Sequence, residues 1–248
     1  MSKGRVRVGI GGWTYAPWRG TFYPEKFPQA KELEYAASKL GAIEINATFY
    51  SRQSPKSWEK WGNSVPGDFQ FAIKGSRYCV MKSKLAEASE ALSGFFAQGF
   101  AALGPKLGPI MWQFTHYRRF DRDDIARFID LLPTDIDGIT LRHAIEPRHE
   151  SFRDERFLDL CQARNIAIVF EDSDDYPLIE ADTADFTYAR LQRMSEDVPS
   201  GYSAPAVGGF ATKASEWRER GDVYIFMING AKVRAPAAAL ALQDKLGL

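Results

Sequence analysis

Strand-like and helix-like segments alternate along the whole chain of 248 residues. Apolar side chains at every second position are typical of a strand, whereas a spacing of three and four residues is typical of an amphipathic helix. Strand patterns occur at 5–12, 42–49, 69–75, 108–114, 137–146, 166–170, 185–192 and 222–229. Helical patterns occur at 30–40, 55–65, 85–103, 121–132, 152–164, 212–220 and 235–246, and no element is predicted for 176–183.

About eight strand-plus-helix units in a chain of this length predict an α/β fold, a closed (β/α)8 TIM-type barrel. We expect one domain spanning residues 1–248, because no linker or change in composition interrupts the alternation. A doubly wound open sheet is the alternative, although such sheets usually have fewer strands. The turn at Gly9-Ile10-Gly11-Gly12 lacks the third glycine of a dinucleotide-binding fingerprint and leads into an aromatic loop.

The charge balance excludes a broad basic field. Lys plus Arg and Asp plus Glu number 32 each, so any preference for an anionic or cationic partner must be local. The first residues contain no apolar signal-like region, and no later stretch approaches the ~18 apolar residues of a membrane span, so we expect a cytoplasmic protein without a membrane partner. Cys79 and Cys161 are too isolated to predict a disulfide framework or a zinc site.

Polar residues recur at the carboxyl ends of the predicted strands, where barrel enzymes place their sites. Several pairs, such as Glu44/Asn46 and Arg190/Gln192, share one face of their strand while the other face is apolar. We expect a structural charge network around Glu44 and Arg142, which lie deeper in their strands, and catalytic groups nearer the mouth. The catalytic candidates are Glu146, Lys74 and Asp172, with Glu171 as an alternative to its neighbour.

An aromatic loop after the first strand supplies a second signature. Trp13 and Tyr15 follow the strand directly and lie near Arg19, and flat rings beside cations suit stacking on a sugar or a base. A hydrophobic plug over the barrel mouth would explain Phe22 and Tyr23 equally well. The candidate substrate-binding residues are Trp13, Tyr15, Asn46, Thr48, Gln113, Arg148, His149, Arg190 and Asn229.

No cofactor is predicted. A Mg²⁺ or Mn²⁺ ion held by Glu44, Glu146 and Asp172 is an open alternative, but Lys74 and the arginines already supply positive charge in the same space. Only three histidines occur, and His143 is out of phase with Glu146, so it should face the outer helices.

Four motifs in order resemble the YecE-like family, a domain of unknown function. The first motif is Gly12-Trp13-Thr14-Tyr15, with the following Trp18-Arg19-Gly20 and Phe22-Tyr23-Pro24. The second is Glu-Ile-Asn-Ala-Thr-Phe-Tyr at 44–50, and the third is Phe-Ala-Ile-Lys at 71–74. The fourth is Glu-Pro-Arg-His-Glu-Ser-Phe at 146–152. The resemblance covers almost the whole chain and implies a TIM-type barrel. It implies a cleft formed by Trp13, Tyr15, Glu44, Asn46, Lys74, Glu146, Arg148 and His149. The chain departs from the family pattern at Phe152, at Gln192-Arg193, where a His-Gly is usual, and at Ile228-Asn229.

These patterns together predict an enzyme acting on a phosphorylated sugar or a nucleic-acid-derived anion. Arg148 and Arg190 would bind the anion, and Glu146 would act as general acid or base. Lys74 would either keep that carboxylate ionised or itself act as base or Schiff-base nucleophile. The alternatives are a non-catalytic binding module for nucleotides or single-stranded nucleic acid, and a barrel that has lost its activity.

Overall fold

The computed structural model describes residues 3–248 and contains a ring of parallel strands. The strands are β1 (Val6–Gly11), β2 (Ala42–Ile45), β3 (Gln70–Lys74), β4 (Leu107–Gln113), β7 (His143–Glu146), β8 (Ile166–Ile168), β9 (Phe170–Asp172), β10 (Phe186–Leu191) and β11 (Asp222–Met227). Their order in the sheet is β8-β7-β4-β3-β2-β1-β11-β10-β9. β8 and β9 are two parts of one segment, separated by Val169, so the ring has eight strand positions, and the prediction of a TIM-type barrel is confirmed.

The split segment closes the ring. β8 pairs with β7, and β9 pairs with β10 on the other side, with Phe170 opposite Ala189 and Asp172 opposite Leu191. The backbone N–H of Val169, between the two parts, still donates to the carbonyl of Ile145 at 2.9 Å.

Small residues on the early strands and large residues on the late ones fill the barrel interior. Ala42, Ala72 and Ala144 face the axis from β2, β3 and β7, whereas Tyr188 and Phe226 cross it from β10 and β11. Gly9 of β1 leaves room for these large side chains, because a Cβ there would lie 3.3 Å from the ring of Phe226 and closer still to the backbone of Ala42. The interior is therefore packed with side chains, as TIM barrels require.

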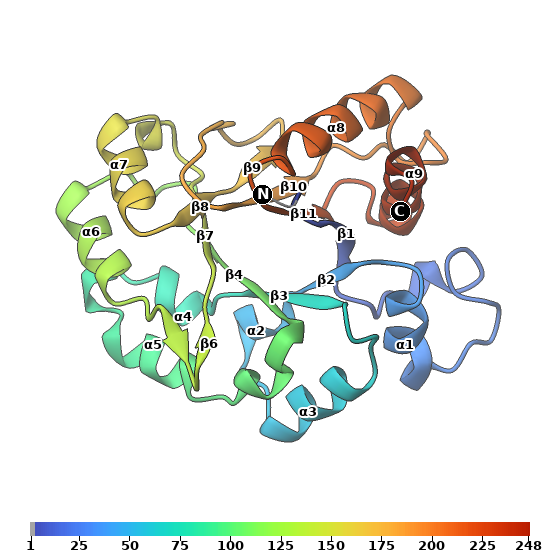
Figure 1. The fold of residues 1–248 in the computed structure, drawn as a ribbon, viewed down its shortest axis with the longest axis horizontal. Coiled ribbons are helices and arrows are strands. Elements are labelled where there is room, and N and C mark those ends of the chain that lie inside the picture. The colour runs from blue at the N-terminus through green and yellow to red at the C-terminus, as the bar shows by residue number, and fades with distance from the viewer. Residues whose placement is uncertain (1–2) are drawn as a thin grey trace.

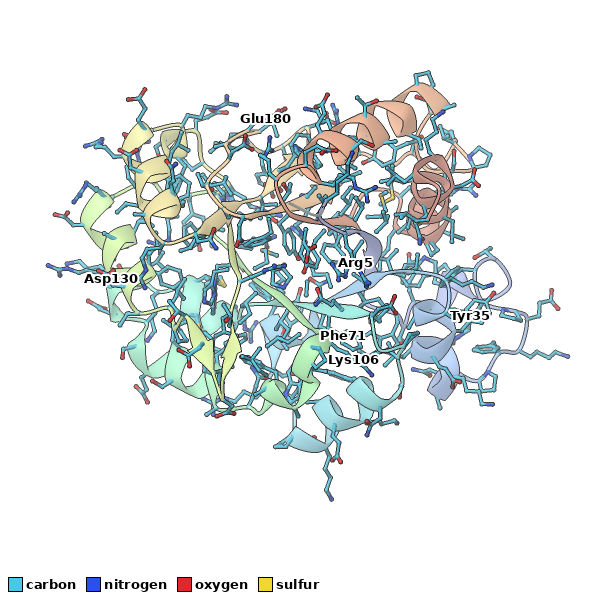
Figure 2. The ribbon with its side chains drawn as sticks, viewed as in Figure 1. Arg5, Tyr35, Phe71, Lys106, Asp130 and Glu180 are labelled. Carbon is cyan, nitrogen blue, oxygen red and sulfur yellow. The ribbon has the colours of Figure 1, made fainter. Side chains whose placement is uncertain are left out.

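The outer layer consists of α1 (Glu32–Ala37), α3 (Pro55–Asn63), α5 (Ser89–Phe96), α6 (Arg122–Asp130), α7 (Glu155–Ala163), α8 (Ala204–Trp217) and α9 (Ala235–Leu246). They surround the strands, with α1 and α6 on opposite sides of the ring (Figure 1). Figure 2 shows Tyr35 and Asp130 at these two opposite edges of the molecule. No helix lies between β9 and β10, where the loop 173–185 takes the place of the sixth outer helix.

Two predicted elements are shorter than the sequence pattern indicated. The strand expected at 42–49 ends at Ile45, and the chain then forms the short helix α2 (Ala47–Tyr50). The long helix expected at 85–103 is divided into a 3-10 turn at Leu85–Glu87, α5, and the irregular segment Phe100–Lys106. Gly99, with φ of +91°, ends the helical path, because this backbone conformation suits glycine and interrupts a right-handed helix.

The strand expected at 137–146 is also divided. A small antiparallel hairpin of β5 (Asp135–Ile136) and β6 (Ile139–Thr140) precedes β7. Asp137 and Gly138 both have positive φ, which is the two-residue turn that an Asp-Gly pair favours. Another short helix, α4 (Arg77–Val80), follows β3 at the mouth of the barrel. Across residues 3–248, none of the helices combines the length and the apolar character needed to cross a bilayer.

Candidate functional site

A cavity of about 490 Å³ opens at the carboxyl ends of β1, β2, β3, β10 and β11. Its volume lies within the range of about 300–1,000 Å³ that is usual for small-molecule sites. Its side chains of chemical interest are Trp13, Asn46, Tyr50, Trp61, Lys74, Arg190, Asn229 and Lys232. All the charged groups that line this cavity in the described part of the chain are cations, so its field favours an anion.

Lys74, the last residue of β3, is 9 % exposed and projects into this cavity. Its Nζ lies 4.5 Å from the centre of the Phe49 ring and forms no ion pair within residues 3–248. Burial, followed by repulsion from Arg190, lowers the pKa of Lys74 to about 8, although Glu44 and Glu146 partly oppose the shift. A substantial fraction of this amine is therefore neutral and nucleophilic slightly above neutral pH.

Arg190 connects the cavity to a buried charge network beneath it. From β10 its Nε and Nη2 donate to Oε2 and Oε1 of Glu44 at 3.1 and 3.2 Å, and its Nη1 donates to Glu146. Tyr188 also donates to Glu44, at 2.7 Å, so that carboxylate has three donors. Glu44 thus belongs to a buried charge network, as expected, but its partner is Arg190 and not Arg142.

Glu146, at the end of β7, is fully buried, and both of its oxygens are occupied. Oε1 accepts from Gln113 at 2.7 Å and from Arg148 at 2.6 Å, while Oε2 accepts from Arg190. Burial opposes its ionisation, but Arg190, Arg148 and Lys74 outweigh that effect and lower the pKa of Glu146 to about 2. A carboxylate that is ionised at neutral pH and has both oxygens hydrogen-bonded holds the arginines in place and is a poor proton carrier, which does not support the predicted acid–base role.

Glu171 is the carboxylate with unused bonding capacity. Its Oε1 accepts from Gln192 at 2.5 Å and from Arg148 at 3.4 Å, whereas its buried Oε2 has no hydrogen-bond partner in the described part of the chain. Burial and repulsion from Glu146 raise the pKa of Glu171 to about 8. This side chain is therefore largely protonated at neutral pH, so its pKa, unlike that of Glu146, lies in the range that suits a general acid or base.

A chain of amides joins Glu171 to the cavity. Asn229, which lines the cavity, donates to Oε1 of Gln192 at 2.8 Å, and Gln192 donates to Glu171. Asn229 adopts a positive φ of 58°, a conformation that asparagine tolerates better than most residues. Gln192 thus completes a hydrogen-bonded connection from the cavity to Glu171 on this side of the mouth.

Asp172 does not face the barrel interior, contrary to its predicted catalytic role. Successive residues of a strand point to opposite faces, and Glu171 takes the inward position opposite Arg190. Asp172 instead accepts from Tyr202 at 2.8 Å and pairs with Arg193 at 2.6 Å on the outer side. The register between β9 and β10 therefore shows that Glu171, and not Asp172, faces the barrel interior.

Thr48 and Tyr15 do not line the cavity, although both were expected to bind substrate. Thr48 lies in α2, is buried, and donates to the Lys74 carbonyl at 2.7 Å, so it attaches this helix to β3. Tyr15 packs edge-on against Trp18, and the amine of Lys232 lies 4.7 Å from its ring centre. Both residues support the walls of the cavity from behind.

Gln113, Arg148 and His149 also lie outside the cavity wall. The first two bind Glu146, and Arg148 additionally stacks 4.0 Å from the ring centre of Tyr176 in the loop after β9. His149 caps the turn Glu150–Phe152, its Nδ1 accepting from the Ser151 backbone at 3.1 Å. Of the predicted substrate-binding residues, those brought together at the cavity are Trp13, Asn46, Arg190 and Asn229.

Arg142 has a structural role at the opposite end of the barrel, away from Glu44. It donates to Asp222 at 2.9 Å and to the hydroxyl of Tyr224 at 3.1 Å. Arg142 precedes β7 by one residue and therefore lies at the amino end of that strand, whereas it was expected beside Glu44. His143 faces outward as predicted, with its ring bonded to Trp112 at 3.2 Å and to the Pro133 carbonyl at 2.7 Å.

Sequence reasoning missed three residues of the cavity wall. Tyr50 and Trp61 come from α2 and α3, and Lys232 comes from the loop after β11. Their positions depend on how the chain turns after each strand, which strand periodicity does not encode. As for metals, residues 3–248 contain no group of three His, Cys, Asp or Glu side chains placed to hold an ion.

Comparisons with known proteins agree with this architecture. A DUF72 family protein of Thermotoga maritima MSB8 has a structure with a TM-score of 0.77 and 21 % identity, covering 97 % of this chain and 98 % of that one. Another from Enterococcus faecalis V583 gives a TM-score of 0.75 and 16 % identity, with 98 % and 96 % coverage. The structure of SacUVDE is more distant, with a TM-score of 0.54, 12 % identity and coverage of 99 % and 100 %.

The sequence itself gives the family. The UPF0759 protein YunF of Bacillus subtilis (strain 168) is 32 % identical over 69 residues, which are 28 % of this chain and only 23 % of that protein. Residues 7–248 match the family described as "Protein of unknown function DUF72". The match covers nearly the whole chain, in line with the uncharacterised family that its four motifs indicated. This chain belongs to the DUF72 family.

Proposed function

We propose that this protein is an enzyme that binds a phosphorylated sugar, or a related anion derived from nucleic acid, in the cavity at the barrel mouth, with Lys74 as its catalytic group. The observation that carries the proposal is the amine of Lys74, which is buried in the cavity, lacks an ion-pair partner in the described part of the chain, and has its pKa lowered to about 8. Such amines serve as bases and Schiff-base nucleophiles in enzymes.

The cations of the cavity support an anionic ligand. The charge of Arg190 is already balanced by Glu44 and Glu146, which leaves Lys74 and Lys232 to meet a phosphate. Burial lowers the pKa of Lys232 as well, and an anion bound beside it would restore the charged form. The amides of Asn46 and Asn229 add neutral donors at the same mouth.

The aromatic wall supports a ring-containing ligand. Trp13 packs edge-on against Trp61, with ring centres 5.1 Å apart, and both line the cavity beside Tyr50. Edge-to-face packing fixes the orientation of the rings, so their faces and edges form a rigid apolar surface next to the cations. A sugar ring provides the matching apolar face, and its phosphate provides the charge.

The chemistry that this lysine offers is carbonyl chemistry. The neutral amine would attack the carbonyl carbon of an open-chain sugar, water would leave, and a carbon–nitrogen double bond would form. General-base catalysis by the same amine is the other option, in which Lys74 removes a proton from the bound ligand. Protonated Glu171, reached through Gln192 and Asn229, would keep the inner end of the site uncharged.

Borohydride trapping tests the proposal. The protein is incubated with ribose 5-phosphate or glyceraldehyde 3-phosphate at pH 8, reduced, digested and analysed by mass spectrometry. We expect a reduced adduct on the peptide that contains Lys74, no such adduct in Lys74→Gln, and normal labelling in Lys39→Gln, which removes an exposed lysine at the opposite end of the barrel.

Each result has a defined meaning. An adduct confined to Lys74 supports the Schiff-base form, and calorimetric binding without an adduct, lost in Lys74→Gln, supports the general-base form. If neither phosphorylated sugars nor nucleotides bind, or if they bind equally well to Lys74→Gln, the proposal fails. A non-catalytic binding protein is then the better description.

A further inference from the structure

We infer that the barrel mouth continues into a binding surface for single-stranded nucleic acid, formed by the loops after β2, β3 and β4. This inference deepens the proposed function, on which it rests for the reaction, because it makes the ligand of the cavity part of a polymer. We call this surface the tyrosine rim and define it by Tyr50, Tyr78 and Tyr117 with the cations beside them.

Large apolar side chains are exposed at few places on this protein, and they concentrate on the rim. Tyr50, Tyr78 and Tyr117 are 62 %, 60 % and 64 % exposed, and the neighbouring Met81 is 52 % exposed. The other exposed large apolar side chains within residues 3–248 are Leu240, at 38 %, and Leu248, at 55 %. Three exposed aromatic rings at the mouth cost solvation free energy without stabilising the core, which is typical of a binding surface.

The topology places these tyrosines in a row. They follow β2, β3 and β4, which are adjacent in the sheet in that order, and adjacent strands lie about 4.8 Å apart. α2, which ends at Tyr50, contacts α4, which carries Tyr78. The rim therefore follows the edge of the barrel mouth, and Tyr50 belongs both to it and to the wall of the cavity.

Cations without carboxylate partners accompany the rings. The three loop segments 46–54, 75–84 and 114–120 contain Arg52, Arg77, Lys82, Lys84, Arg118 and Arg119, and no Asp or Glu. Arg118 is bound to Asp124 of α6, but Arg77, Lys82, Lys84 and Arg119 form no ion pair within the described residues. This local excess stands out against a net charge of zero for the whole chain.

A groove extends the rim away from the cavity. Tyr117, Lys82, Lys84 and Arg119 line a depression of about 680 Å³ between the loops after β3 and β4. Its carboxylates are largely occupied: Asp121 caps α6, and Asp124 accepts from the backbone of Leu85 and Ala86. Asp123, on the far wall, pairs with Arg122.

Rings alternating with unpaired cations match a single strand better than other anionic partners. Bases stack on exposed aromatic rings regardless of sequence, and the cations track the phosphates. A duplex would offer phosphates but no accessible base faces for three tyrosines. The guanidinium of Arg77 lies 5.1 Å from the centre of the Tyr78 ring, so a ring for a base and a cation for a phosphate occur at one position.

Fluorescence anisotropy with a labelled oligothymidylate of about twelve nucleotides tests the inference, since such strands occupy sites of about 4–16 nucleotides. The variant Lys82→Gln/Lys84→Gln removes two rim cations. The control Lys39→Gln/Lys245→Gln removes two exposed lysines distant from the mouth. Tyr78→Ala/Tyr117→Ala removes two rings that contribute little to the core, so folding is expected to be unchanged and is verified by circular dichroism.

We expect binding at low salt with a logarithmic salt slope that the lysine variant reduces by up to about 0.7 per residue and the control leaves unchanged. Each tyrosine removed should weaken binding about tenfold, because stacking on a single base has that magnitude. Both rim variants keep Lys74, so trapping by borohydride should be unchanged in them; failure of the borohydride experiment therefore leaves the oligonucleotide result intact, and the reverse also holds.

Three outcomes of the anisotropy experiment overturn the inference. They are undetectable binding at low salt, equal loss of affinity in the control variant, and equal affinity for a duplex of the same length, which would mean phosphate contacts without stacking. Sedimentation with vesicles containing anionic lipid forms a further arm. If the tyrosine variant loses vesicle binding but not oligonucleotide binding, the rim is a membrane-contact surface and the nucleic-acid inference is wrong.

Discussion

Arg190 and Glu44 form a two-point ion pair in the interior of the barrel, with nitrogen–oxygen distances of 3.1 and 3.2 Å. The arginine is 1 % exposed and the glutamate is completely buried. A planar guanidinium matches both oxygens of a carboxylate, and no other basic side chain offers this geometry. The pair also holds the third nitrogen toward Glu146, so one residue links the carboxylates of β2 and β7.

Arg190→Lys should therefore lower the free energy of unfolding by about 3–5 kcal/mol, because a lysine leaves buried carboxylate oxygens unpaired. Urea denaturation measures the effect. The matched control is Arg153→Lys, whose pair with Glu150 is on the surface and should change stability by less than about 1 kcal/mol. Equal stability changes in the two variants would contradict a structural role for Arg190.

Glu146→Gln should destabilise the protein by a similar ~3–5 kcal/mol, because the new amide would place a donor against two arginines. The folded pKa of Glu146 lies below its unfolded value, so its contribution is complete above about pH 4.5 and is lost as the pH falls toward 2. Wild-type stability should decline more steeply than that of the variant across this interval. A variant that folds normally but loses only turnover would return Glu146 to a catalytic role.

Lys74→Met should stabilise the protein at pH 7 while it removes trapping by borohydride. The pKa of Lys74 falls from 10.5 to about 8 on folding, and each unit corresponds to about 1.4 kcal/mol, so the charged amine costs at most ~3–4 kcal/mol. The sign follows from proton binding: the unfolded chain binds more protons between pH 8 and 10.5, and wild-type stability should rise across that range. The variant should lack this rise, and an unchanged pH profile would show that the amine is well solvated.

Glu171→Gln should flatten the pH dependence of stability on the acidic side. The folded pKa of Glu171 is raised above its unfolded value, so the native protein binds more protons between about pH 4.5 and 8 and loses stability as the pH increases. The slope from this group can reach about 1.4 kcal/mol per pH unit. Denaturation at several pH values compares the variant with Asp172→Asn, whose carboxylate pairs with Arg193 on the outer side and should leave that slope in place.

Periodicity was sufficient for the barrel and for the strands that carry Lys74 and Arg190. Lys74 and Arg190 lie on the inner face, as their spacing predicted, because alternate residues of a strand must face the same way. The choice between Glu171 and Asp172 required the register of β9 against β10, which depends on long-range pairing. Thr48 was misplaced because its strand ends three residues earlier, where the chain turns into α2.

In the aromatic loop, too, the sequence pattern predicted the position of one side chain and not of the other. Trp13 lines the cavity as expected, whereas Tyr15, two residues later, supports Trp18 from behind. A loop has no fixed period, so the directions of its side chains depend on what they meet. Glu146 and Lys74 illustrate a further limit, since their pKa values depend on how many arginines and how much apolar surface the fold gathers around each.

The division of the strand at Val169 affects the local stability of the ring. β8 and β9 each pair with only one neighbour, and no helix covers them from the loop 173–185. Each of these two pairings spans three residues, compared with five between β1 and β11 and six between β10 and β11, so the amides of β8 and β9 should exchange with solvent ahead of those of β11. Glu171 and the Arg148–Tyr176 stack lie where these strands close the ring, so local opening there would admit water to the unpartnered Oε2 of Glu171.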